Sequence, residues 1–164
     1  MLIAVAVTLA IIGVTPPARS AAGSAVEGVL HHLGIGDGAT ADQRGLTQPM
    51  RQAFRRARRA AARDGVALSL TSGWRSAEHQ QRLYDEALES YRSAAEARKW
   101  VLPPDESSHV TGEAIDVGPG PVERTWLEEN GSRWGLCRRY ANETWHFEIR
   151  TSPGMLCPAL ESHA

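Results

Sequence analysis

The clearest hydrophobic pattern lies between residues 47 and 64. Met50, Phe54, Ala57 and Ala61 recur at three- and four-residue intervals, which places them on one face of a helix. Thr47 can cap the start of this helix, and a proline in the first turn costs no hydrogen bond. The pattern therefore predicts an amphipathic helix that packs one face against a core.

Other segments predict a mixture of short strands and further helices. Apolar residues alternate with small or polar ones between 66 and 70, as in a half-buried strand. Strands are also predicted at 114–117 and 145–149, helices at 76–97 and 122–130, with Gly131 closing the latter helix, and a proline-containing loop at 101–108. Because helices and strands do not alternate regularly, we expect an α+β fold with helices packed on a small, mostly antiparallel sheet.

The N-terminal segment predicts export. Residues 1–14 are apolar apart from Thr8, and a stretch of small residues follows at 18–25. The apolar run is shorter than the about 20 residues that span a bilayer as a helix. We interpret residues 1–25 as a signal peptide or a retained N-terminal anchor, although no basic residue precedes the run. A buried N-terminal helix is the other interpretation. Residues 26–45 are interpreted as a linker and residues 46–160 as the catalytic domain.

Composition narrows the possible functions. The chain has 164 residues, enough for one domain, and its 18 basic and 19 acidic residues argue against a general nucleic-acid binder. Six arginines crowd the helix at 47–64, either as a cationic face for an anionic cell wall or membrane surface, or as a solvated face in an arginine-rich composition. We favour the solvated face.

The two cysteines, Cys137 and Cys157, are too few for a disulfide scaffold or a cysteine-based zinc finger. Export would make a disulfide between them plausible, worth about 3 kcal/mol for a loop of this length. Two unpaired buried thiols are the alternative.

Three short segments contain the candidate chemistry. His109, Asp116 and His146 could supply three protein ligands to Zn²⁺ and leave a fourth position for water, as catalytic zinc sites do. Glu143 could accept a proton, and Arg75 could hold a carboxylate or a developing oxyanion. Spacing alone does not establish this site. Glu143 and His146 would point to opposite faces of a strand, so the chain would have to bend near residue 144.

The motifs themselves resemble a known family. Ser107-x-His109-x-x-Gly112-x-Ala114-x-Asp116, followed by Glu143-x-Trp145-His146, resembles the metal motifs of the VanY-like zinc D-alanyl-D-alanine carboxypeptidases of peptidase family M15. The upstream sequence Ser72-Gly73-Trp74-Arg75-Ser76 is similar to a third motif of that family. The resemblance covers about residues 45–150 and implies the fold shared with the hedgehog and lysostaphin group.

Roles follow from the resemblance residue by residue. It implies that His109, Asp116 and His146 bind one zinc ion, that Glu143 is the catalytic base, and that Arg75 meets substrate oxygen atoms. Ser107 is expected at the edge of the substrate site, and Gly112 is expected to allow a close backbone approach. Residues 86–106 match no family feature, and we expect them to shape the substrate groove.

The sequence therefore predicts an exported zinc metallopeptidase that acts on peptidoglycan stem peptides, with release of terminal D-alanine as the expected reaction. An LD-carboxypeptidase, a D,D-dipeptidase or an endopeptidase of the same family is the alternative. A non-catalytic zinc-binding module is a third hypothesis, which the presence of Glu143 argues against. Neither a nucleic acid nor a stable protein partner is expected.

Overall fold

The computed structural model describes residues 43–164. The expected export segment at 1–25 and most of the expected linker lie outside the described residues. None of the helices between residues 43 and 164 has the length and apolar character needed to cross a bilayer.

Helix α2 (Gln48–Arg63) forms where the hydrophobic pattern predicts it. The Thr47 hydroxyl accepts a hydrogen bond from the backbone N–H of Met50 at 3.4 Å, which caps the first turn. The predicted stripe, Met50, Phe54, Ala57 and Ala61, is fully buried. Five of the six helix arginines, Arg55, Arg56, Arg58, Arg59 and Arg63, are exposed.

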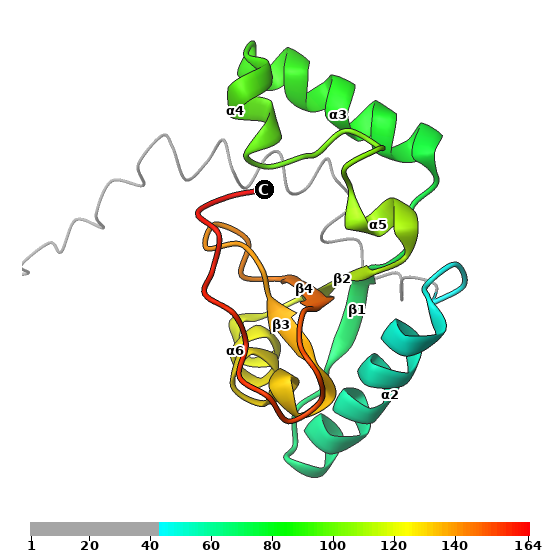
Figure 1. Cartoon of the computed structure of the whole chain (residues 1–164), viewed down its shortest axis with the longest axis vertical. Helices are drawn as coiled ribbons and strands as arrows, with labels where there is room; N and C mark the ends of the chain where they lie inside the picture. The colour runs from blue at the N-terminus through cyan, green and yellow to red at the C-terminus, as the bar shows by residue number, and fades with distance from the viewer. Residues whose placement is uncertain (1–42) are drawn as a thin grey trace, which may run out of the picture.

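The sheet has four strands, and each strand pairs antiparallel with its neighbour, which confirms the predicted α+β class (Figure 1). The spatial order is β1 (Ser69–Ser72), β2 (Ala114–Gly118), β4 (His146–Ile149) and β3 (Leu136–Arg138). Strand β1 begins three residues later than the apolar alternation suggests. Strand β3 was not predicted, because three residues carry too little pattern to be recognised.

The two faces of the sheet carry different kinds of side chain. Ile115, Val117 and Phe147 belong to the main core, together with residues of α2 and α6 (Pro121–Asn130). Because side chains alternate along a strand, Asp116 and His146 lie on the opposite face. Helix α6 ends at Asn130 with Gly131 as its C-cap, as predicted, and Gly131 then begins a short 3₁₀ helix, η1 (Gly131–Trp134). A Cβ at Gly131 would lie 2.4 Å from the carbonyl oxygen of Leu136.

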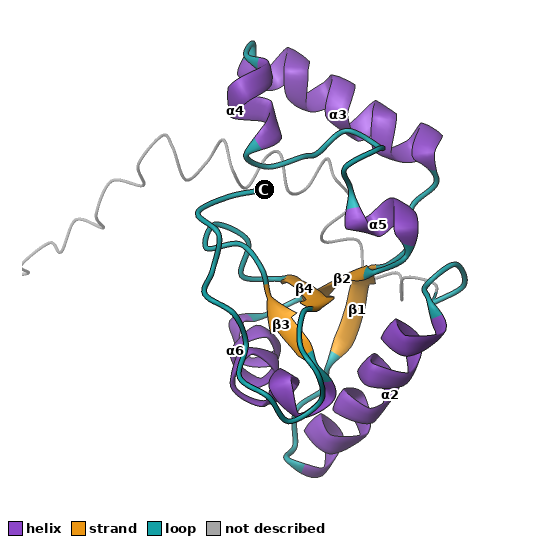
Figure 2. Ribbon diagram, in the orientation of Figure 1, coloured by secondary structure: helices purple, strands orange, loops and turns teal. Residues whose placement is uncertain are grey.

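Helices α3 (Ala77–Tyr91), α4 (Ala94–Arg98) and α5 (Ser108–Thr111) lie on the polar side of the sheet (Figure 2). The prediction of one helix from 76 to 97 is wrong. Helix α3 ends at Tyr91 because Arg92 takes a left-handed conformation with φ of 52°, and the Ser93 hydroxyl then caps α4. Helix α5 was not predicted, since a four-residue helix shows no periodicity.

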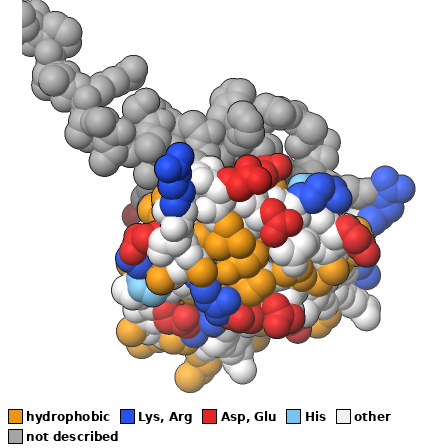
Figure 3. All heavy atoms as spheres, turned by 90° about the horizontal axis from the view of Figure 1, so that it is seen from above, with side chains coloured by type: hydrophobic (Ala, Val, Ile, Leu, Met, Phe, Trp, Pro, Cys, Tyr) orange, Lys and Arg blue, Asp and Glu red, His pale blue; other side chains and the backbone are white. Residues whose placement is uncertain are grey.

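A second, smaller apolar cluster holds α3 and α4 together. It consists of Leu83, Ala87, Ala97 and Val101, with Trp100 packed against it. Figure 3 views the molecule from this end and shows apolar side chains gathered on the face, with acidic and basic side chains around them. This cluster is separate from the main core, so α3 and α4 form a small lobe above the sheet.

The C-terminal tail, residues 152–164, runs back along the sheet towards the polar side (Figure 1). A disulfide joins Cys137 of β3 to Cys157 of the tail. Further along, the backbone of Glu161 hydrogen-bonds to those of Arg139 and Ala141, at 2.9 and 2.8 Å. The sequence left the pairing of the cysteines open, and the structure contains the bridge.

Gly112 joins α5 to β2 through a turn that only glycine accommodates well. Its φ is 75°, and a Cβ there would lie 2.3 Å from the carbonyl oxygen of Gly45. The Gly112 carbonyl also accepts a hydrogen bond from the N–H of Thr47 at 3.0 Å. The close approach expected from the motif is present, and it ties the start of α2 to the end of helix α5, which carries His109.

Replacing Gly112 with alanine should therefore destabilise the protein more than replacing Gly65. Both glycines have φ near 75°, but a Cβ at Gly65 meets no atom within 4 Å. We expect G65A to cost about 1 kcal/mol, from the left-handed backbone alone, and G112A to cost about 2 kcal/mol more. Urea unfolding of both variants measures the difference, and equal losses would contradict a steric role for Gly112.

Candidate metal centre and catalytic site

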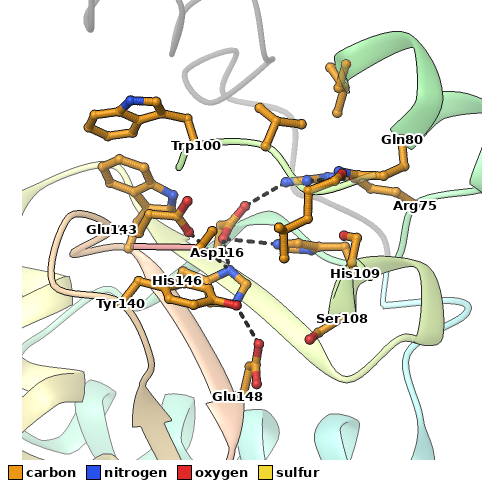
Figure 4. A pocket seen from close by; sticks show the side chains of 16 residues that line it. Arg75, Gln80, Trp100, Ser108, His109, Asp116, Tyr140, Glu143, His146 and Glu148 are labelled. Atoms are coloured by element: carbon orange, nitrogen blue, oxygen red, sulfur yellow. Dashed lines mark hydrogen bonds and ion pairs between the residues drawn. The ribbon is translucent and has the colours of Figure 1, made fainter. Parts of the chain in front are cut away.

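The three predicted metal ligands come together from three elements (Figure 4). His109 belongs to α5, and Asp116 and His146 are direct cross-strand partners on β2 and β4. Asp116 Oδ1 lies 3.3 Å from His109 Nε2 and 3.2 Å from His146 Nδ1. All three side chains are buried, and their ligand atoms lie within 4.8 Å of one another. Residues 109, 116 and 146 thus form one compact donor set.

The second ring nitrogen of each histidine has its own partner, which fixes the ring orientation. His109 Nδ1 donates to the carbonyl oxygen of Gly73 at 2.7 Å, because a carbonyl can only accept. His146 Nε2 lies 3.0 Å from a carboxylate oxygen of Glu148. The nitrogens left to face the centre are therefore Nε2 of His109 and Nδ1 of His146.

These partners also set the charges of the histidines. Burial, followed by the charge of Arg75, lowers the pKa of His109, so this ring is neutral at pH 7. Burial acts in the same direction on His146, but hydrogen bonds to Asp116 and Glu148 outweigh it and raise its pKa to about 10. A metal ion held by His146 Nδ1 would take the place of the extra proton on that ring.

Arg75 lies against the carboxylate of Asp116. Its guanidinium donates to Asp116 Oδ2 at 2.8 Å, to Ser72 Oγ at 3.0 Å and to Gln80 Oε1 at 3.2 Å. Gln80, which sequence reasoning missed, is 1% exposed and donates to the carbonyl of Leu102. Gln80 lies three residues before the inward-facing Leu83. This helical spacing could have indicated that Gln80 also points inwards. The predicted contact of Arg75 with substrate stays a prediction.

Asp116 keeps its negative charge despite complete burial. Burial by itself would raise its pKa, but the neighbouring His109, the hydrogen bond from His146 and the charge of Arg75 outweigh this effect. The pKa of Asp116 is therefore held well below its usual range, and the centre contains a fixed carboxylate.

Glu143 reaches the centre from a loop rather than from strand β4. The chain turns at residues 144 and 145, as the expected bend requires, and Glu143 Oε2 lies 3.7 Å from His146 Nδ1. The loop is anchored on both sides: Arg124 donates to Thr144 Oγ1 at 3.1 Å, and Asn142 donates to the carbonyl of Lys99 at 2.6 Å. Burial raises the pKa of Glu143 to about 7.

A pocket opens over these residues. Ser107, which is 6% exposed, lies in its wall beside Arg75, His109 and Glu143. Sequence reasoning missed several other lining residues, among them Ser108, Tyr140, Glu148 and Ala164. Of the segment 86–106 that was expected to shape the groove, residues 100–102 line the pocket.

The donor set fits a zinc ion. Tetrahedral zinc bound at about 2.0–2.2 Å by histidine nitrogen and carboxylate oxygen places neighbouring ligand atoms roughly 3.3 Å apart. The two donor separations to Asp116 Oδ1, 3.3 and 3.2 Å, match this spacing. Nitrogen and oxygen donors with no thiolate, and three protein ligands rather than four, are typical of catalytic zinc sites.

Several known proteins are similar to this chain. A D-alanyl-D-alanine carboxypeptidase of Enterococcus faecalis is 35% identical over 112 residues, covering 54% of this chain and 42% of that protein. The chain thus spans about two fifths of this relative's length. The vancomycin resistance D,D-pentapeptidase VanY from the VanB-type cassette, solved as a mutant in complex with Zn(II), is 30% identical with a TM-score of 0.58.

That structural match covers 63% of this chain and 71% of the VanY chain. VanYB in complex with D-alanine-D-alanine matches with the same TM-score and identity, over 63% of this chain and 70% of that chain. The family model described as VanY, D-alanyl-D-alanine carboxypeptidase, matches residues 43–152, and the chain therefore belongs to the VanY family.

Proposed function

We propose that this protein is an exported zinc carboxypeptidase that removes the terminal D-alanine from peptidoglycan stem peptides. The observation that carries this proposal is the buried triad of His109, Asp116 and His146 with Glu143 beside it, all facing one pocket. The VanY structures bound to Zn(II) and to D-alanine-D-alanine support the choice of metal and substrate.

His109, Asp116 and His146 would hold the zinc ion. When bound, zinc activates a water molecule for attack and polarises the scissile carbonyl. The negative charge of Asp116 offsets part of the ion's charge, and the two histidines remain neutral as ligands. Burial of all three side chains excludes bulk water from the ligand atoms.

Glu143 would act as the general base and then as the general acid. It takes the proton from the attacking water and returns it to the nitrogen of the departing amino acid, which leaves as the peptide bond breaks. The carboxyl group of Glu143 is placed for both steps, because it is buried beside the triad and lines the same pocket. A zinc-binding module without activity would need no such carboxylate.

Arg75 and Ser107 would bind the substrate. Both line the pocket beside the triad, and a guanidinium can hold the terminal carboxylate of a peptide by paired hydrogen bonds. Because Arg75 already donates to Asp116, it would link the position of the substrate to the position of a metal ligand.

The disulfide supports the proposal of export. Bridges such as Cys137–Cys157 persist in oxidising compartments and are rare in the cytosol of most organisms. An apolar N-terminal run followed by small residues is the sequence feature that would direct the chain across the membrane. Stem peptides are reached on that side.

Digestion of defined stem peptides tests the reaction. The full chain loaded with zinc should release one D-alanine from a pentapeptide ending in D-Ala-D-Ala, seen by mass, and a chelator should abolish the release. A tetrapeptide and a cross-linked dimer serve as controls for LD-carboxypeptidase and endopeptidase activity. Release of a dipeptide, or cleavage of the control peptides alone, would contradict the proposed bond specificity.

The variant E143A should keep the metal and lose the reaction. Since general acid–base catalysis contributes about 10²–10⁴-fold, we expect kcat to fall by at least about 100-fold. The zinc content of E143A, measured by elemental analysis, should equal that of the unmodified protein. The exposed Glu128 provides a matched control as E128A. Full activity of E143A would refute its role as base.

The elevated pKa of Glu143 also predicts a pH-dependent stability. Glu143 ionises near pH 7 in the folded chelated protein but near its ordinary 4.5 in the unfolded chain. The folded state therefore loses stability as pH rises from 4.5 to 7, and E143Q escapes this loss. Between pH 5 and pH 8, urea unfolding should show E143Q gaining about 1–3 kcal/mol on the unmodified protein. A difference independent of pH would contradict the buried environment of Glu143.

A further inference from the structure

His146 is held from behind by a carboxylate outside the predicted site. His146 and Glu148 are two residues apart on β4, so their side chains share one face of the strand. His146 Nε2 donates to Glu148 Oε1 at 3.0 Å, and Glu148 is 8% exposed (Figure 4). This contact leaves Nδ1 as the nitrogen that faces Asp116.

Glu148 is held in turn by Arg139, which follows β3. Arg139 Nη1 lies 3.2 and 3.3 Å from the two carboxylate oxygens of Glu148. The Nε of the same guanidinium donates to Glu161, at 3.1 and 3.2 Å from its two oxygens. Arg139 therefore bridges two carboxylates, one beside the metal centre and one on the C-terminal tail.

Glu161 lies on a part of the chain beyond residues 43–152, which the family model matches. The disulfide holds the tail four residues before it, and Glu161 exchanges backbone hydrogen bonds with Arg139 and Ala141. Its carboxylate also accepts from Arg150 at 2.9 Å. Beyond Glu161 the tail continues to Ala164, which lines the pocket.

We propose that Glu148, Arg139 and Glu161 are positioning residues for His146, and that the C-terminal tail is thereby a working part of the metal centre. The chain of contacts fixes the ring with Nδ1 towards the other ligands and keeps a proton on Nε2. A carboxylate on the far nitrogen of a metal-binding histidine raises the basicity of the ligating nitrogen, and such partners contribute substantially to metal affinity.

The more deeply a contact is buried, the larger the effect on zinc binding that we expect when it is removed. Glu148 touches the ligand and is buried, so its loss removes both the orientation of His146 and a compensating charge. Glu161 is 40% exposed at its side chain and acts through Arg139, so solvent screens its contribution. We therefore expect a clear effect at Glu148 and a smaller effect of the same sign at Glu161.

Zinc affinity is the measurement that separates positioning from general stability. On the full chain, competition with a chromophoric chelator should show that E148A weakens zinc binding by about 10–100-fold. E148Q should recover much of the affinity, because its amide oxygen can still accept from His146 Nε2. E161A should fall between E148A and the unmodified protein.

E128Q is the matched control. Glu128 forms an ion pair with Arg138 at 3.1 Å, next to Arg139 in the sequence but away from His146. The zinc affinity of the E128Q protein should equal that of the unmodified protein. Unfolding of the chelated proteins shows whether each variant folds, and E148Q keeps the test valid if E148A does not.

A spectroscopic readout completes the test. With Co²⁺ in place of zinc, the visible absorption of E148A should differ from that of the unmodified protein, since a reoriented imidazole changes the ligand field. An E148A protein that folds, binds zinc within about twofold of the unmodified affinity and keeps its cobalt spectrum would overturn this inference alone. The inference rests on the proposed zinc site, so an unmodified protein that binds no zinc would overturn both.

Discussion

A buried negative charge in the middle of a small sheet is the constraint on which the rest of the site depends. Asp116 is 1% exposed, and an unpaired ion at such a depth would cost several kcal/mol. Arg75, His109 and His146 share that charge, and each comes from a different part of the chain. The fold therefore has to bring the end of β1, helix α5 and strand β4 to one point.

This requirement explains features that lie some distance from the chemistry. The turn at Gly112 places α5 against the start of α2, and the carbonyl of Gly73 orients His109 from the loop after β1. Arg124, which belongs to α6, holds the loop that carries Glu143. The helices thus position the loops at the site as well as covering the apolar face of the sheet.

The sequence was sufficient to predict the features that depend on nearby residues. The stripe of α2 and its cap are local, and the short motifs around His109, Asp116 and His146 made the family recognisable. Contacts that join distant segments were not predictable in this way. Gln80 beside Arg75 and Glu161 beside Arg139 depend on the packing of separate elements, which no periodicity records.

Short elements were missed for a related reason. Strand β3 and helix α5 have three and four residues, and tertiary contacts rather than propensity determine their conformation. Glu148 was missed as well, although its position two residues after His146 in a predicted strand was visible in the sequence. That spacing indicated a shared face, and only the structure shows that the two side chains meet.

The alternation along β4 also makes the metal centre a check on strand pairing. Asp116 faces His146 because β2 and β4 pair in one register. A slip of one residue would place Trp145 or Phe147 opposite Asp116 and would turn the apolar core face of β4 outwards. Neither aromatic side chain can ligate a cation, so a mispaired chain would lose its core packing and its metal together. Metal binding would therefore stabilise only those molecules in which β2 and β4 have paired in the correct register.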